Sequence, residues 1–75
     1  IEVVFNNDNS KALKYINESV KLNSNYYESY FIRAKIKQEQ NDIIGSLKDI
    51  NESIRLKNNY NEAYFLRAQI KQKQG

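Results

Sequence analysis

The stretch SLKDINESIRLKNNYNEAYFLRAQIKQKQ, residues 46–74, repeats the stretch ALKYINESVKLNSNYYESYFIRAKIKQEQ, residues 12–40, at a constant offset of 34 residues. The pairing needs no gap, and 18 of the 29 paired positions are identical. A fixed period without gaps is the sequence signature of a stacked repeat array. The repetition therefore predicts a fold that uses one structural unit more than once.

Helix is the regular structure that the pattern favours. The chain has no proline and two glycines, and strict alternation of apolar and polar residues is absent beyond a few positions. Apolar residues recur at helical spacing in both copies: Ala12, Leu13, Ile16 and Val20, then Leu47, Ile50 and Ile54. We expect four helices, at about 9–23, 26–40, 42–57 and 60–74.

The expected helix starts carry capping residues. Asp8 and Asp42 precede the first and third helices, where a carboxylate can accept hydrogen bonds from the free backbone N–H groups. The second and fourth helices follow asparagines that stand three residues before glutamates, which is the spacing of a capping box: Asn25 with Glu28, and Asn59 with Glu62.

The expected helix at 26–40 has apolar residues on more than one side. On a helical wheel Tyr27, Tyr30 and Ala34 fall together, and Ile36 lies well away from them. A helix of this kind is packed by more than one neighbour. The pattern therefore predicts a middle helix of a stack.

Composition limits the classes of protein. Seventy-five residues make at most one domain, and no apolar run approaches the ~20 residues of a membrane span. The chain contains no cysteine, which removes disulfides and thiolate metal sites and favours an intracellular, reducing compartment. The net charge of +3 is modest, and both signs are interspersed. The charge alone therefore does not indicate nucleic acid or anionic lipid.

The chain resembles the tetratricopeptide repeat (TPR) family, whose unit is 34 residues folded as two antiparallel helices. Residues 30–34 and 64–68 match its aromatic segment, with Ala34 and Ala68 at the small position where two helices approach closely. Residues 12–16 and 46–50 match its later element. The chain departs from the family pattern at Lys37 and Lys71, which replace an aromatic, and at Ser24 and Asn58, which replace a proline.

The resemblance implies an all-α helix-turn-helix repeat solenoid of four antiparallel helices. Residues 7–26 would be the second half of one unit, 27–60 a whole unit, and 61–75 the first helix of the next. Asn7 and Asp8 match Asn41 and Asp42, so residues 1–5 are expected to be the remnant of a preceding first helix. Because the chain starts without methionine, we expect it to be part of a longer protein.

Binding, and not catalysis, is the function that the resemblance implies. An enzyme needs a base, a nucleophile or a metal site, but the chain has no histidine, no cysteine and no glycine-rich phosphate loop. We expect no cofactor and no metal. The first helices of such units line a concave groove that binds a protein or peptide, and the residues expected to face it are Glu28, Phe31, Ile32, Lys35, Glu39, Glu62, Phe65, Leu66, Gln69 and Lys73.

Two alternatives stay open for these residues. Phe31 and Phe65 are either groove or core residues, since large apolar residues at helical spacing are usually buried. The charged residues either recognise a partner or keep the face soluble. Arg33 and Arg67 are expected to lie over a neighbouring helix and to pair with a carboxylate at the surface.

The sequence also bears on the kind of partner. Some TPR proteins hold the C-terminal carboxylate of heat-shock chaperones through basic and amide side chains, but the matching positions here carry Glu28, Ile32, Glu62 and Leu66. We therefore expect no chaperone-tail clamp. Single-stranded RNA, read through tyrosine, arginine and lysine, is the competing partner class, but the net charge is low and acidic residues lie in the expected groove.

The last expectation concerns the two ends of the array. Tyr64 and Ala68 would present an apolar face that no later helix in the chain covers. The helix at about 9–23 would lack its own partner. Complementary open ends favour head-to-tail association, so we expect residues 64–72 of one copy to contact residues 1–16 of another.

Overall fold

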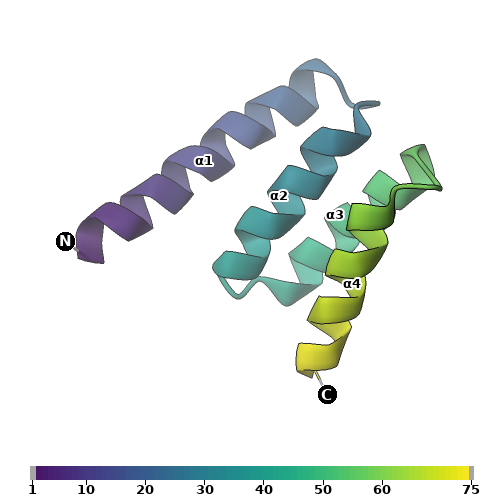
Figure 1. Ribbon diagram of the computed structural model, residues 1–75. Coiled ribbons are helices and arrows are strands. Elements are labelled where there is room, and N and C mark those ends of the chain that lie inside the picture. Colours follow the sequence, from purple (N-terminus) through teal and green to yellow (C-terminus); the bar gives the residue numbers. More distant parts are fainter. Residues whose placement is uncertain (1, 75) are drawn as a thin grey trace.

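The computed structural model describes the backbone of residues 2–74 and the side chains of residues 9–74. Residues 2–74 form four α-helices and no strand: α1 (Glu2–Leu22), α2 (Tyr27–Glu39), α3 (Ile43–Leu56) and α4 (Asn61–Gln74). Consecutive helices run in opposite directions (Figure 1). The expected all-α fold of four antiparallel helices is confirmed, and the bounds of α2, α3 and α4 agree with the sequence to within one residue or two.

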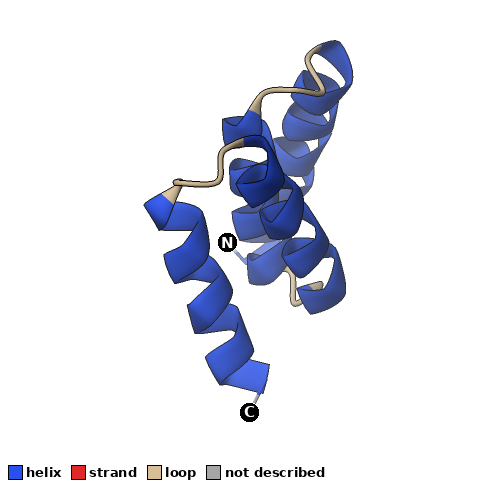
Figure 2. Cartoon of the chain, turned by 90° about the vertical axis from the view of Figure 1, so that its right-hand side faces the viewer, coloured by secondary structure: helices blue, strands red, loops and turns tan. Residues whose placement is uncertain are grey.

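Each helix packs on its neighbours in sequence. α1 contacts α2, α2 contacts α3, α3 contacts α4, and α2 also contacts α4. The helices form a slab of 39 × 35 × 17 Å, and short loops join them at alternating edges (Figure 2). Contact restricted to near neighbours is the arrangement of a helical repeat, in which each unit is covered by the next.

The start of α1 corrects the sequence prediction. The helix begins at Glu2 and runs without interruption through Asn7 and Asp8, so Asp8 does not precede a helix and residues 2–5 do not belong to a separate one. No glycine or proline lies between residues 2 and 22, and nothing in that stretch stops a helix once it has formed. The match of Asn7 and Asp8 to the turn at Asn41 and Asp42 was misleading for this reason.

The turn before α3 shows what a helix start needs. Asn41 adopts φ of 67°, a left-handed conformation that asparagine tolerates better than most residues. Asp42 then caps α3, because its Oδ1 accepts a hydrogen bond from the backbone N of Gly45 at 3.0 Å. A Cβ at Gly45 would lie 2.3 Å from the Asp42 carboxylate, so glycine makes room for the cap. In the first copy of the repeat, Lys11 stands at the position that matches Gly45, and there the helix α1 is continuous.

The capping box predicted at Asn25 and Glu28 is wrong. The N-cap residue of α2 is Tyr26, and its side chain makes no capping bond. The Tyr26 hydroxyl instead donates to Oε1 of Glu28, while the backbone N of Asn25 bonds to Oδ1 of Asn23 at 3.2 Å. Asn25 thus belongs to a polar turn. α4 likewise begins at Asn61, two residues after Asn59.

The core lies between α2, α3 and α4. Its buried apolar members are Ala34, Ile50, Tyr60, Ala63, Leu66 and Ile70, with Tyr27, Phe31, Ile43, Leu47 and Ile54 packed around them. Two buried serines bring α3 close to α2: Oγ of Ser46 donates to the carbonyl of Ala34 at 2.8 Å, and Oγ of Ser53 to the carbonyl of Tyr27 at 2.9 Å. Small side chains with satisfied hydroxyls permit this approach without a desolvation cost.

Candidate functional site

The residues expected to bind a partner lie on α2 and α4, and we call them the first-helix stripe. On α2 they are Glu28, Phe31, Ile32, Lys35 and Glu39, and on α4 they are Glu62, Phe65, Leu66, Gln69 and Lys73. Glu28, Lys35 and Glu39 are exposed, as are Glu62, Gln69 and Lys73. The polar members of the stripe are therefore accessible on both helices.

Leu66 is a correction to the stripe. It is 7% exposed and belongs to the core cluster with Ile50 and Ile70, so it does not face a partner. Its repeat equivalent Ile32 is 41% exposed. Leu66 packs in a cluster with residues of α2 and α3. Ile32 lies one turn after Ser29, whose Oγ bonds to Ser19 Oγ of α1 at 3.0 Å, and it does not belong to that cluster.

The sequence left open whether Phe31 and Phe65 are groove or core residues, and the structure places the two side chains differently. Phe31 is half-buried and packs against the core, with its ring centroid 5.1 Å from that of Tyr60. Phe65, at the matching position of α4, is 66% exposed. Phe65 is thus a large apolar side chain of the stripe that a partner can reach.

Charged members of the stripe are partly engaged by neighbouring rings. Nζ of Lys35 lies 5.4 Å from the centroid of the Phe31 ring, a cation–π distance that orients the lysine along α2. Glu28 accepts the hydrogen bond of the Tyr26 hydroxyl, and this bond raises the pKa of Tyr26. On α4, no described side chain forms an ion pair with Glu62 or Lys73.

An aromatic cluster lies beside the stripe at the starts of α2 and α4. The ring of Tyr60 stands edge-on to that of Tyr27 at 4.9 Å, and Nζ of Lys57 lies 4.8 Å from the Tyr27 centroid and 3.3 Å from its hydroxyl. Burial, with the nearby charges of Glu28 and Glu62, raises the pKa of Tyr60 to about 12. These rings are engaged in packing, which leaves fewer tyrosines to stack on nucleic-acid bases.

A buried ion-pair cluster joins α2 to α3. The Asp49 side chain is 4% exposed. It accepts hydrogen bonds from Nε and Nη2 of Arg33 at 2.8 and 2.9 Å, and Nζ of Lys37 lies 3.1 Å from its Oδ2. The bond to Asp49 raises the pKa of Arg33 despite partial burial. With every oxygen partnered, the cluster is a structural link between helices.

Asp49 was not among the residues expected to matter, although the sequence carries a signal for it. Asp49 lies on the buried face of α3 together with Ser46, Ile50 and Ser53. Tyr15 stands at the matching position of the first copy. An acidic residue at a buried helical position needs a cationic partner. The expectation that Arg33 pairs with a carboxylate is confirmed, but that carboxylate is buried and not at the surface. The same expectation is wrong for Arg67, which bonds to the amide oxygen Oδ1 of Asn51 at 2.8 Å.

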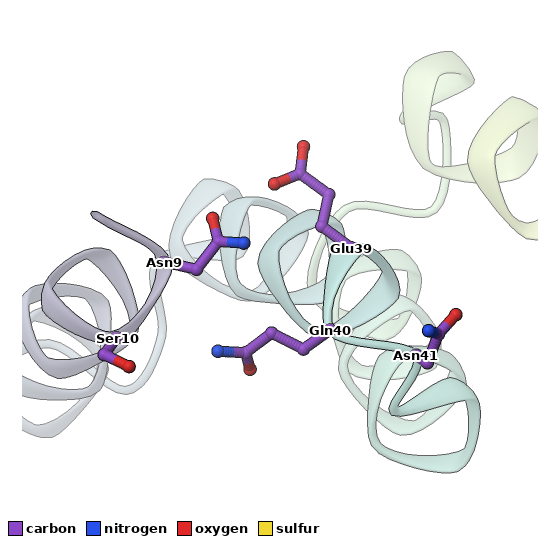
Figure 3. Close-up of a pocket in the computed structure, with 5 residues that line it drawn as sticks. All are labelled: Asn9, Ser10, Glu39, Gln40 and Asn41. Carbon is purple, nitrogen blue, oxygen red and sulfur yellow. The ribbon is translucent and has the colours of Figure 1, made fainter. Parts of the chain in front are cut away.

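A pocket of about 450 Å³ opens between the early part of α1 and the end of α2 (Figure 3). Its lining consists of Asn9, Ser10, Glu39, Gln40 and Asn41. Small-molecule sites are mostly apolar with a few convergent polar groups, and this pocket is polar and open. It is a gap where two helices diverge, and Glu39 is its one member from the stripe.

Residues 9–74 contain no group of histidine, cysteine, aspartate or glutamate side chains that could hold a metal ion. Among residues 2–74, no helix combines the length and apolar character that crossing a membrane requires.

Comparisons with protein-family models, with curated proteins and with solved structures found no match to this chain.

Proposed function

We propose that the chain is a TPR-like protein-interaction module that binds a peptide or a protein segment along the first-helix stripe. The observation that carries the proposal is Phe65, a phenylalanine with two-thirds of its surface exposed in the middle of α4. Large exposed aromatic side chains are enriched among the residues that dominate binding energy. Ile32 adds a second accessible apolar group on α2.

The mixed polarity of the stripe supports the same function. Glu28 and Lys35 on α2, and Glu62 and Lys73 on α4, place both signs of charge around the exposed apolar groups. An apolar centre with a polar rim is the usual composition of a protein interface. Glu28 and Glu62 would repel a terminal carboxylate, so a peptide that ends in such a group, including a chaperone tail, is not the expected ligand.

A peptide-display selection against the full 75-residue chain tests the proposal. We expect peptides selected on the chain to lose about tenfold or more in affinity for Phe65→Ala, because truncating an aromatic anchor costs 2 kcal/mol or more. Lys35→Glu should also weaken binding of any selected peptide with acidic residues. Circular dichroism should show both variants folded, because both side chains are exposed.

Ile44→Ala is the matched control. Ile44 is 81% exposed on α3 and lies outside the stripe, so its truncation should leave the affinity within about twofold. If Phe65→Ala and Ile44→Ala weaken binding equally, or neither does, the stripe is not the binding surface. A salt titration separates the RNA alternative, because RNA affinity falls steeply with added salt and the affinity of a peptide held by apolar anchors does not.

A further inference from the structure

The face of α4 opposite to the core repeats the face of α2 that α3 covers. On α2, Tyr30 and Ala34 are buried and Arg33 and Lys37 hold Asp49. Their equivalents on α4, which we call the open α4 face, are Tyr64, Arg67, Ala68 and Lys71. Tyr64, Ala68 and Lys71 are exposed and Arg67 is half-buried.

The guanidinium of Arg67 is held in the same way as that of Arg33. Nη1 of Arg33 donates to Oδ1 of Asn17 at 2.9 Å, and Nη1 of Arg67 donates to Oδ1 of Asn51 at 2.8 Å. Arg33 uses its other two nitrogens, Nε and Nη2, to bind Asp49. Among the side chains of residues 9–74, none accepts a hydrogen bond from those two nitrogens of Arg67.

We propose that the open α4 face binds a partner helix whose aspartate pairs with Arg67 and Lys71, as Asp49 of α3 pairs with Arg33 and Lys37. The partner is an amphipathic helix with the α3 pattern of a small residue, an aspartate three positions later, and an apolar residue next to it. The small residue is needed because Ser46 lies against the backbone of Ala34, and Ala68 offers the same close approach.

The positive charge of the open α4 face argues against a second copy of the chain as its partner. In a head-to-tail pair, α1 of one copy would lie on α4 of the other and place Tyr15 where α3 has Asp49. Tyr15 is 72% exposed and has no carboxylate to offer. Arg67 and Lys71 would then be covered without an anion, which costs free energy. The acidic helix is therefore the occupant that fits the face.

The proposal is independent of the first-helix stripe, because the stripe residues Glu62, Phe65, Gln69 and Lys73 lie at other positions of α4. Failure of one proposal leaves the other intact. The probe is a synthetic peptide of residues 42–57, which carries the α3 pattern, added to the isotope-labelled full chain. Nuclear magnetic resonance spectra should show shifts in the amide signals of residues 64, 67, 68 and 71.

Three variants make the test specific. The Asp49→Asn peptide should bind about tenfold more weakly, because it loses a charge-assisted, bidentate contact. Lys71→Glu in the chain should weaken the unchanged peptide by a similar factor, whereas Lys14→Glu, which makes the same change of charge at an exposed position of α1 outside both surfaces, should alter affinity by less than about twofold. When the Lys71→Glu chain is combined with the Asp49→Asn peptide, the affinity should fall by less than the product of the two separate factors, because the two groups interact.

Three results would overturn the proposal. One is the absence of shifts on α4 with the unchanged peptide. Another is equal binding of the Asp49→Asn peptide. The third is a peptide of residues 8–23, which carries Tyr15 in place of the aspartate, binding as tightly as the peptide of residues 42–57, since that result would point to a second copy of the chain as the occupant.

Discussion

α2 and α4 have closely similar sequences at the 34-residue spacing, yet they bury different faces. Tyr30 of α2 is 9% exposed, and its equivalent Tyr64 is 39% exposed. On the side that faces the preceding helix the order is reversed, because Leu66 of α4 is in the core and Ile32 of α2 is not. The same residue types therefore serve as core on one helix and as surface on the other.

The difference follows from the neighbours of each helix. α3 covers the Tyr30 and Ala34 face of α2, and in the described part of the chain nothing covers the matching face of α4. Leu66 of α4 packs in the cluster formed with α2 and α3, whereas α1 diverges from α2 toward its own start (Figure 1). In a stacked array the interface between helices, and not the helix alone, decides which residues are buried. The four predictions below test this comparison.

The largest difference is expected for the paired tyrosines. Tyr30→Ala should lower the free energy of unfolding by about 3 kcal/mol, because it empties a buried site and removes the bond from the hydroxyl to the carbonyl of Ser24 at 2.8 Å. Tyr64→Ala should cost about 1 kcal/mol, since Tyr64 is partly exposed although its hydroxyl makes the same bond to Asn58. Urea unfolding followed by circular dichroism measures both values, and equal losses would contradict the comparison.

The two alanines at matching positions, Ala34 and Ala68, should differ in how large a side chain they can accommodate. Ala34→Leu should destabilise the fold by about 2 kcal/mol, because Ser46 lies against the Ala34 backbone and no space remains for a larger side chain. Ala68→Leu should change stability by less than about 0.5 kcal/mol, because Ala68 is exposed. Thermal unfolding of the two variants side by side is the measurement. A large loss for Ala68→Leu would mean that the open α4 face is covered in solution.

Arg33 bonds to a carboxylate, whereas its repeat equivalent Arg67 bonds to an amide oxygen. Arg33→Ala should cost about 1–2 kcal/mol, because Asp49 then keeps only Lys37 in a buried site. Arg67→Ala should cost less than about 0.5 kcal/mol, since within residues 9–74 Arg67 is held by one bond to an exposed asparagine side chain and by its position over the exposed ring of Tyr64. Denaturant midpoints of the two variants give the answer. Asp49→Asn in the Arg33→Ala background should then add little further loss, and full additivity would show that the two groups do not interact.

The smallest effect concerns Tyr60, whose equivalent Tyr26 is exposed. The ordinary pKa of a tyrosine is 10.0, and burial raises that of Tyr60 to about 12. Because the folded protein favours the neutral phenol, this contribution to stability is complete below pH 10 and is lost as the pH rises from 10 to 12. The unfolding free energy of the unchanged chain should therefore fall more than that of Tyr60→Phe over this interval, by about 1 kcal/mol once the linkage value of roughly 2.7 kcal/mol is reduced for solvent screening of a side chain near the surface. Parallel pH curves for the two proteins would show that Tyr60 titrates normally.

Much of the fold could be read from the sequence because it is local or periodic. Helical spacing set α2, α3 and α4, and Asp42 was recognised as a cap because the capping bond to Gly45 spans three residues. The start of α1 could not be read in this way. Its residues 7 and 8 repeat the turn at Asn41 and Asp42, but the turn also depends on the end of the preceding helix, where the backbone N of Asp42 bonds to the carbonyl of Lys37 at 2.8 Å.

The candidate site was predicted less completely. The polar members of the stripe are exposed as the pattern indicated, since charged residues avoid burial unless they are paired. Leu66 was expected in the groove together with Ile32, which it matches at the 34-residue spacing, and the sequence does not say which of the two positions a neighbouring helix covers. Asp49 was missed because its importance lies in contacts with Arg33 and Lys37 on another helix.

The sequence by itself determined the 34-residue period, the helical class and the order of the helices, because these depend on residues near one another in the chain. The tertiary structure alone decided that Phe31 packs on Tyr60 while Phe65 faces solvent, and that Asp49 is enclosed by two cations. Paired residues have the same intrinsic preferences, so only the presence or absence of a neighbouring helix can make their burial differ. Exposure in a repeat array is a property of the stack, which no single repeat encodes.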